Sequence, residues 1–163
     1  MELKTTRWAI GDDGVAVLTL SRPARHNAWT GRMHTELRHL LETAEDDPAI
    51  RVVVITGDPE GRAFCPGADS QALAGHADRG GYDPGTPDDL ATPGFGVRPE
   101  FDADFAFFLG LETVTIAAVN GAAAGAGLVL ACWCDLRFAA AGAKLTTAHG
   151  KLNLPVEYGL SWL

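Results

Sequence analysis

The sequence has few cysteines and no long apolar stretch, and both absences narrow its class. Its three cysteines, Cys65, Cys132 and Cys134, are an odd number without regular spacing, so they do not predict a disulfide framework. Cys132 and Cys134 do not form a CxxC motif, and we expect no metal site. No apolar run reaches the length of a membrane span. Charged residues interrupt the first ten positions, which therefore do not resemble a signal peptide, and we expect a reduced, cytoplasmic protein.

Basic residues and serines are also scarce. The chain carries 13 Lys and Arg against 21 Asp and Glu, which gives a net charge of −8. This balance argues against nucleic acid and against an anionic membrane surface as partners. The serines are Ser21, Ser70 and Ser161, and none lies in a nucleophile turn, which disfavours a serine peptidase. Apolar residues make up 47% of the 163 positions, enough for one domain with a hydrophobic core.

The order of apolar runs predicts an α/β fold. Two short runs around Gly11–Gly14 predict a β-hairpin. Apolar residues at helical spacing follow Thr30, a suitable N-cap, and predict a helix. Val52–Ile55 is a continuous β-branched run, which we interpret as a strand buried on both faces. Residues 71–99 hold many Gly, Pro and Asp and few large apolar residues, so we expect a mobile loop there. The last residues, from Val156, predict the start of a helix.

The most informative stretch is Thr113–Asp135, which predicts a strand, a glycine-rich turn and a buried helix. No bulky side chain occurs from Gly121 to Gly127, so the backbone there can approach a ligand closely. The first N–H groups of the following helix, which would start near Gly125, have no partner within the helix. Such groups favour an oxygen that gains negative charge. A tight joint between a strand and a helix would require the same small residues, and this alternative stays open.

Four motifs occur in order along the chain. They are Arg22-Pro23-Ala24-Arg25-His26-Asn27-Ala28, Phe64-Cys65-Pro66-Gly67-Ala68-Asp69, the turn from Ala117 to Gly127, and Cys134-Asp135-Leu136-Arg137. Each resembles a signature of the enoyl-CoA hydratase/isomerase family, also called the crotonase family. The resemblance extends from about Arg7 to Leu163. It implies a crotonase-like (ClpP/crotonase) spiral of β-β-α units over residues 1–163, without the C-terminal helical region of the family. Family members usually form trimers or dimers of trimers, so we expect a homo-oligomer.

The resemblance also implies a site for an acyl-CoA substrate. In this family two backbone N–H groups bind the thioester oxygen, and by position they belong here to Ala68 and Ala126. Coenzyme A would be part of the substrate, and no permanently bound cofactor is expected. The residues that the resemblance places at the CoA site are Arg25, Ala28, Pro66, Gly67, Asp69 and Ser70.

The chain departs from the hydratases of this family at both catalytic glutamates. Val129 stands at the first position and cannot transfer a proton. His149 stands at the second; a histidine can transfer protons near neutral pH, although a lone histidine is more often structural. Glu157 occupies the position of the catalytic aspartate in dienoyl-CoA isomerases and aryl-CoA dehalogenases of the family. We therefore prefer Glu157 as the acid/base group, against the alternative of a solvated glutamate at a helix N-terminus.

These features predict an enzyme that stabilises a thioester enolate, by hydration or isomerisation chemistry. The alternative is a non-catalytic CoA-thioester-binding or assembly subunit of the same fold. A dinucleotide site at Gly125–Gly127 is disfavoured, because the GxGxxG motif is incomplete and no acidic residue ends a strand about 20 residues later. We also expect Leu160, Trp162 and Leu163 to be exposed and to promote association.

Overall fold

The computed structural model describes residues 1–71, 74, 105–153, 156 and 158–163. Its strands are β1 (Thr6–Ile10), β2 (Val15–Leu20), β3 (Val52–Gly57), β4 (Ala63–Cys65), β5 (Val114–Val119), β6 (Ala122–Ala124), β7 (Leu136–Ala139) and β8 (Leu145–Thr146). Its helices are α1 (Gly31–Asp46), α4 (Ala126–Trp133) and α5 (His149–Leu152), with short 3-10 helices at Pro23–Arg25, Pro59–Gly61 and Ala106–Gly110.

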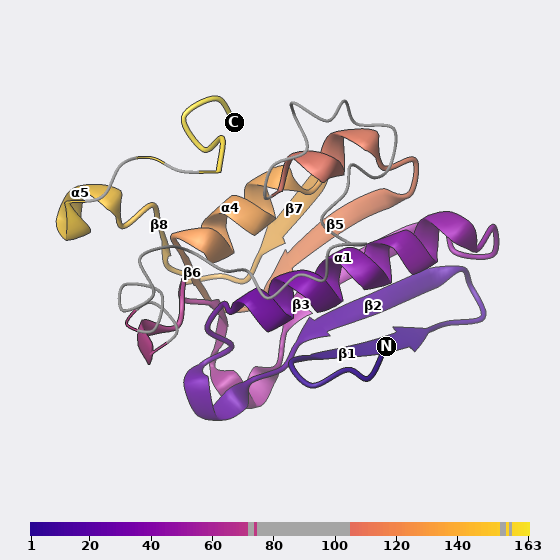
Figure 1. The fold of residues 1–163 in the computed structure, drawn as a ribbon, viewed down its shortest axis with the longest axis horizontal. Coiled ribbons are helices and arrows are strands. Elements are labelled where there is room, and N and C mark those ends of the chain that lie inside the picture. Colours follow the sequence, from indigo (N-terminus) through magenta and orange to yellow (C-terminus); the bar gives the residue numbers. More distant parts are fainter. Residues whose placement is uncertain (72–73, 75–104, 154–155, 157) are drawn as a thin grey trace.

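The strands form a large sheet of order β1-β2-β3-β5-β7 and a small sheet of order β4-β6-β8 (Figure 1). The hairpin of β1 and β2 is antiparallel, and every other pairing between these strands is parallel. Parallel strands linked through helices are the pattern expected of an α/β fold. The predicted hairpin and the α/β class are therefore confirmed.

Helix α1 forms where the sequence predicts it. The Oγ of Thr30 accepts a hydrogen bond from the backbone N–H of Met33 at 3.2 Å, which caps the first turn. Met33, Leu37 and Leu41 recur at helical spacing and are almost completely buried in the core. The apolar side of α1 thus packs against the large sheet.

Glu36 is a buried charge that ties α1 to the N-terminal segment. Its side chain has no exposed surface. Its carboxylate accepts hydrogen bonds of 2.6 to 2.9 Å from the N–H groups of Lys4 and Thr5, the hydroxyls of Thr5 and Thr6, and Nε of Arg32. Burial alone would raise the pKa of Glu36, but these donors outweigh it and lower the pKa to about 2. Glu36 is therefore ionised and fully paired at neutral pH.

The strand predicted at Val52–Ile55 is buried on one face rather than two. Val53 and Ile55 of β3 have no exposed surface, whereas Val52 and Val54 are half-buried. The register places Val54 beside half-buried side chains of β2 and β5 on the same outer face. Helices α1 and α4 both lie over the opposite face (Figure 1), so in the described part of the chain only that face is covered.

The stretch from Thr113 to Asp135 forms the predicted strand, turn and buried helix. Strand β5 leads through β6 and Gly125 into α4, which begins at Ala126. The side chains of Val129 and Leu130 have no exposed surface and join the core. The turn holds a short strand, β6, that the sequence did not predict.

The cysteines differ in burial. Cys65 has no exposed surface and Cys134 is 1% exposed, and burial raises the pKa of each thiol to about 12. Cys132 on α4 is only half-buried, so the interpretation of both neighbouring cysteines as buried apolar residues holds for Cys134 alone.

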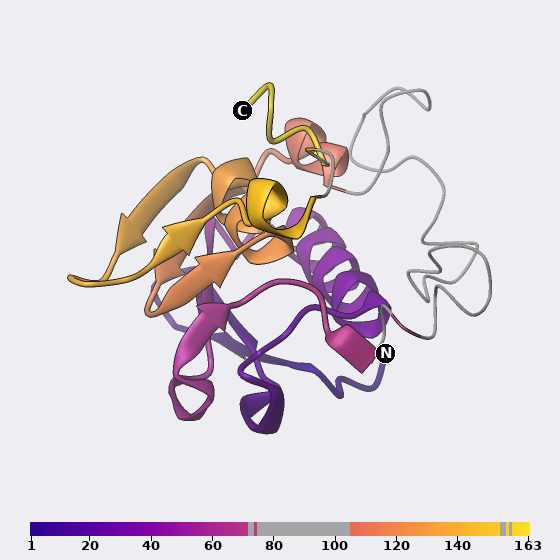
Figure 2. The same cartoon turned by 90° about the vertical axis from the view of Figure 1, so that its left-hand side faces the viewer.

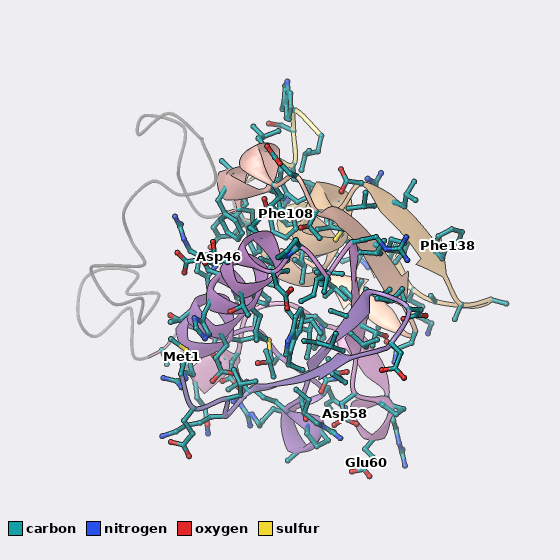
Figure 3. The ribbon with its side chains drawn as sticks, turned by 90° about the vertical axis from the view of Figure 1, so that its right-hand side faces the viewer. Met1, Asp46, Asp58, Glu60, Phe108 and Phe138 are labelled. Atoms are coloured by element: carbon teal, nitrogen blue, oxygen red, sulfur yellow. The ribbon has the colours of Figure 1, made fainter. Side chains whose placement is uncertain are left out.

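The C-terminal part is far more exposed than the core. All four residues of β7 are exposed, and its Phe138, 65% exposed, projects at the periphery of the molecule (Figure 3). Residues 158–162 form turns rather than the predicted helix; Nε1 of Trp133 donates to the carbonyl of Tyr158 at 2.9 Å and holds this segment against α4. Trp162 and Leu163 are exposed as expected, whereas Leu160 is half-buried.

Two expectations concern other parts of the chain. Of the mobile loop predicted at 71–99, all but Gln71 and Ala74 lie outside the described residues. Among the helices that are described, none has the length and apolar character needed to cross a membrane.

Candidate functional site

The small sheet brings three predicted site segments to one edge. Its strands β4, β6 and β8 are parallel, and their arrows point the same way in Figure 2. The chain leaves β4 towards Ala68, β6 towards Ala126 and β8 towards His149. In open α/β sheets ligands bind outside the carboxyl ends of the strands. This edge is therefore the candidate site.

Two glycines allow the first two of these loops to touch. Gly67 has a φ of 109° and Gly125 a φ of 48°, values that residues with a Cβ rarely adopt. A Cβ on Gly67 would lie 3.1 Å from the carbonyl oxygen of Ala124, and a Cβ on Gly125 would lie 3.9 Å from Cα of Gly67. Ala68 and Ala126, which directly follow these glycines, consequently lie in adjacent loops.

The N–H groups of Ala68 and Ala126 donate no hydrogen bond within the described part of the chain. Ala68 forms an isolated β-bridge with Trp29, but the bonds of that bridge run from Trp29 N to Gly67 O and from Asp69 N to Trp29 O, both at 2.8 Å. Ala126 opens α4, where the first N–H groups have no helical acceptor. Two unpaired donors in adjacent loops suit a single oxygen that gains negative charge. Their joint action on a thioester stays a prediction.

Asp69 is buried, and two arginines hold it. One carboxylate oxygen accepts from Nη1 of Arg22 at 3.0 Å and from Nε of Arg25 at 3.1 Å, and the other accepts from Nη2 of Arg25 at 3.2 Å. Arg22 also donates to the carbonyl of Ala28 at 2.6 Å. The hydrogen bond with Asp69 and its charge raise the pKa of Arg25. These contacts join two of the motifs and place Arg25 and Ala28 beside the loop that contains Ala68.

The charges of this cluster do not cancel. Two guanidinium groups face one carboxylate, and the side chain of Arg25 is 40% exposed. Pro66 and Ser70 on the same loop are exposed, whereas Gly67 is buried. An exposed arginine with excess positive charge is suited to a phosphate group. The six residues predicted for the CoA site are thus close together, with Asp69 engaged in holding the arginines.

The two positions that replace the family's glutamates have different surroundings. Val129 in α4 is fully buried and belongs to the hydrophobic core. His149, the first residue of α5, is 8% exposed, and its Nδ1 is the one buried side-chain nitrogen or oxygen in the described residues without a hydrogen-bond partner. Glu157 lies outside the described residues. A catalytic role for His149 or Glu157 stays a prediction.

The enoyl-CoA hydratase/isomerase family matches residues 11–163. The chain belongs to this family. It is 40% identical over 152 residues to a protein named probable enoyl-CoA hydratase from Mycobacterium tuberculosis, a match that covers 93% of this chain and 54% of the relative. It is 38% identical over 152 residues to 1,2-epoxyphenylacetyl-CoA isomerase from Escherichia coli, with the same coverage of 93% and 54%.

Solved structures of the family agree with the fold. Enoyl-CoA hydratase subunit I from Geobacillus kaustophilus superimposes with a TM-score of 0.72 at 30% identity, over 98% of this chain and 55% of that one. The crotonase-like fold expected from the motifs is therefore confirmed. This member of the family spans about half the length of the relatives it matches.

Sequence reasoning did not assign Trp29 to the site. Trp29 is 4% exposed, bridges Ala68 through its backbone, and packs its ring against Phe105 at a centroid distance of 5.3 Å. The ring of Tyr158 lies 5.7 Å from that of Phe105. Aromatic side chains therefore pack next to the loop of Ala68. The available signal was that Trp29 directly follows the motif ending in Ala28.

Proposed function

We propose that this chain acts on acyl-CoA thioesters and stabilises a thioester enolate. The observation that carries the proposal is the pair of unpaired N–H groups, those of Ala68 and Ala126, in adjacent loops. Enolisation places negative charge on the thioester oxygen. Hydrogen-bond donors that the fold already holds in position stabilise that charge. Removing one such donor typically costs about 2.7–4 kcal/mol of transition-state stabilisation.

Glu157 is the proposed acid/base group. Its carboxylate takes a proton from the carbon next to the thioester and returns it to another carbon, which amounts to an isomerisation. The position is supported by the resemblance to dienoyl-CoA isomerases, and Val129 offers no proton-transfer group. General acid–base catalysis is worth about 10²–10⁴-fold in rate. The E. coli relative is named 1,2-epoxyphenylacetyl-CoA isomerase, which supports isomerisation, and the M. tuberculosis relative is named probable enoyl-CoA hydratase, which supports hydration.

The substrate would be held by its coenzyme A part. Arg25, partly exposed and in excess positive charge with Arg22, is proposed to contact the CoA phosphates. The loop of Pro66, Gly67 and Ser70 would lie along the CoA. No permanently bound cofactor is involved in this proposal. A cytoplasmic homo-oligomer, a trimer or hexamer as is usual in the family, is proposed as the working form.

A non-catalytic CoA-thioester-binding subunit is the second candidate. It is favoured by Val129, a fully buried apolar residue where hydratases of the family have a glutamate. The two candidates share the binding site and differ only in turnover.

The first experiment measures enolate formation. Acetoacetyl-CoA is titrated into the protein, and the enolate absorbance and the affinity are recorded. Ala126→Pro removes one proposed donor at the first position of a helix, where proline is well tolerated. Ala126→Ser keeps the N–H and is the matched control. We expect the proline variant to bind acyl-CoA with little enolate signal, and the serine variant to behave as the parent. Absence of acyl-CoA binding in the parent would overturn the proposal.

The second experiment measures turnover. Glu157→Gln should lower the turnover of acyl-CoA substrates by about 10²–10⁴-fold with affinity nearly unchanged. Full activity in Glu157→Gln would refute the assignment. Acyl-CoA binding by the parent without any turnover would favour the non-catalytic subunit.

A further inference from the structure

The outer face of the large sheet is apolar, and no helix of the described part of the chain covers it. Helices α1 and α4 lie over the opposite face (Figure 1). The side chains that point outwards from β2, β3, β5 and β7 belong to valine, isoleucine, leucine, phenylalanine, alanine and threonine, and none is charged. Parallel sheets are normally covered on both faces, and a continuous apolar surface marks an interaction site.

Charge begins only at the margin of this face. Arg7 on β1 donates to Oγ of Ser21 at 3.0 Å and forms an ion pair with Asp58. Exposure of apolar side chains is greatest over the two strands at the other margin, with Val114 at 41%, Leu136 at 49% and Phe138 at 65%. An apolar centre with a polar margin is the composition of a protein–protein interface.

The face carries a projecting ring and a hollow side by side. Thr56, Ala118 and Phe138 are neighbours in register across β3, β5 and β7, and the small side chain of Ala118 lies between the two larger ones. These three residues line a shallow groove of about 260 Å³. The ring of Phe138 stands at the margin of the groove and projects from the molecule (Figure 3). Since a cavity of about 150 Å³ can hold a benzene ring, the groove is large enough for a phenylalanine side chain.

The polar side chains of the groove are already paired. The amide of Asn120, which also lines it, accepts from the N–H of Gly57 at 3.2 Å and donates to the carbonyl of Gly57 at 2.7 Å. Oγ1 of Thr56 donates to the carbonyl of Ala118 at 2.9 Å. An apolar occupant can therefore fill the groove without leaving these polar groups unpaired.

We propose that two copies of this chain pair through the outer face of the large sheet, with Phe138 of each copy in the groove over Ala118 of the other. In a two-fold pair the same patch serves both partners, so a ring and a groove on one patch are satisfied together. A face without charged side chains suits a second copy, because like charges would otherwise meet across the two-fold axis. The two sheets would stack about 10 Å apart with interdigitating side chains. The pairing does not depend on the acyl-CoA chemistry.

The size of the face predicts a weak pair. Four strands of five to six residues give a surface about 20 Å wide and about 17 Å long, so two copies would bury roughly 700–1,000 Å² in total. Interfaces of this size form weak complexes, and we expect a dissociation constant of about 10–100 µM. At about 1 µM most chains are then unpaired, and pairing adds little to the free energy of unfolding.

The test measures mass by sedimentation equilibrium from about 1 to about 500 µM, a range that spans the expected dissociation constant. The mass of the parent should double, whatever form it has at the lowest concentration. Phe138→Lys should raise the dissociation constant at least about tenfold. Because lysine reduces the net charge of −8, added repulsion between chains cannot cause that loss. Trp162→Lys changes another exposed aromatic ring, 72% exposed in the C-terminal segment, and should leave the pairing unchanged.

A second variant tests the groove itself. Ala118→Leu fills the hollow between Thr56 and Phe138 and should weaken the pairing by a similar factor, although it adds apolar surface. A constant mass of the parent overturns the proposal, and so does unchanged pairing in Phe138→Lys or in Ala118→Leu. An equal loss in Trp162→Lys overturns it as well, because association would then depend on the C-terminal segment. If Phe138→Lys does not fold, the parent, Ala118→Leu and Trp162→Lys still decide.

Discussion

The region before residue 72 and the region after α4 differ in whether their buried polar groups have hydrogen-bond partners. In the first, the buried carboxylates of Glu36, Asp58 and Asp69 each accept several hydrogen bonds or ion pairs. In the second, β7 is exposed along its whole length and the buried Nδ1 of His149 has no partner. Paired groups hold a fold together, whereas unpaired ones are available to a ligand. We therefore expect stability to be concentrated in the first region, which also carries Arg25, Ala68 and Asp69 of the candidate site.

The largest expected effect is the loss of the buried carboxylate of Glu36. Glu36→Ala leaves the donors of Lys4, Thr5 and Arg32 without their acceptor, and removing one partner of such a buried group costs about 3–5 kcal/mol. The free energy of unfolding in urea is the measurement. Glu42→Ala on the exposed side of the same helix is the control, with a change of less than about 0.5 kcal/mol. Equal effects at the two positions would show that the Glu36 network does not stabilise the fold.

The same carboxylate makes stability depend on pH. The pKa of Glu36 falls from 4.5 to about 2 on folding, so its contribution is present above pH 4.5 and is lost as the pH falls towards 2. The shift corresponds to roughly 3 kcal/mol. Unfolding free energies of the parent and of Glu36→Gln, which cannot titrate, should differ most above pH 5 and converge near pH 2. A difference that stays constant with pH would contradict the lowered pKa.

Two glycines in helices allow a closely packed region to be compared with an open one. A Cβ on Gly127 of α4 would lie 2.0 Å from the carbonyl oxygen of Cys65, whereas a Cβ on Gly150 of α5 would meet nothing within 4 Å. Gly127→Ala should therefore destabilise the protein by about 1–3 kcal/mol or more, because backbone must move. Gly150→Ala should be neutral or slightly stabilising, since alanine favours helix. Thermal unfolding of both variants provides the comparison, and a tolerated Gly127→Ala would disprove the close contact between α4 and β4.

These comparisons also show which elements of the fold could be predicted from the sequence. Local signals were sufficient for the hairpin, for α1 with its Thr30 cap, and for β5 and α4, since each rests on the spacing of neighbouring residues. The short strand β6 was missed because alanines have little preference for a strand; its pairing with β4 and β8 decides the conformation. The outer face of β3 was misjudged because a run of β-branched residues does not reveal which face is covered.

The candidate site shows the same limit. The motifs identified the loops of Ala68 and Ala126, because bare backbone has a local signature. The arginine partners of Asp69 lie 44 and 47 residues away, and the unpaired Nδ1 of His149 depends on three-dimensional burial. Neither could be predicted from residue spacing.

The smallest expected effect is at the exposed edge strand. Phe138→Thr keeps a residue suited to a strand and removes a ring that is 65% exposed, so the unfolding free energy should change by less than about 0.5 kcal/mol. The same substitution at Phe64 of β4, which has no exposed surface, should cost several times more. A loss above about 1 kcal/mol at Phe138 would mean that another chain covers this strand in solution.

The three thiols differ in burial, so a probe can be attached selectively to one of them, that of Cys132. Thiolates are the reactive form, and Cys65 and Cys134, buried with a pKa of about 12, hold almost none at neutral pH. Cys132 is half-buried on α4, the helix whose first residue is Ala126. A maleimide fluorophore added to the folded, unaltered protein would label Cys132 selectively and report movements of α4 by its emission.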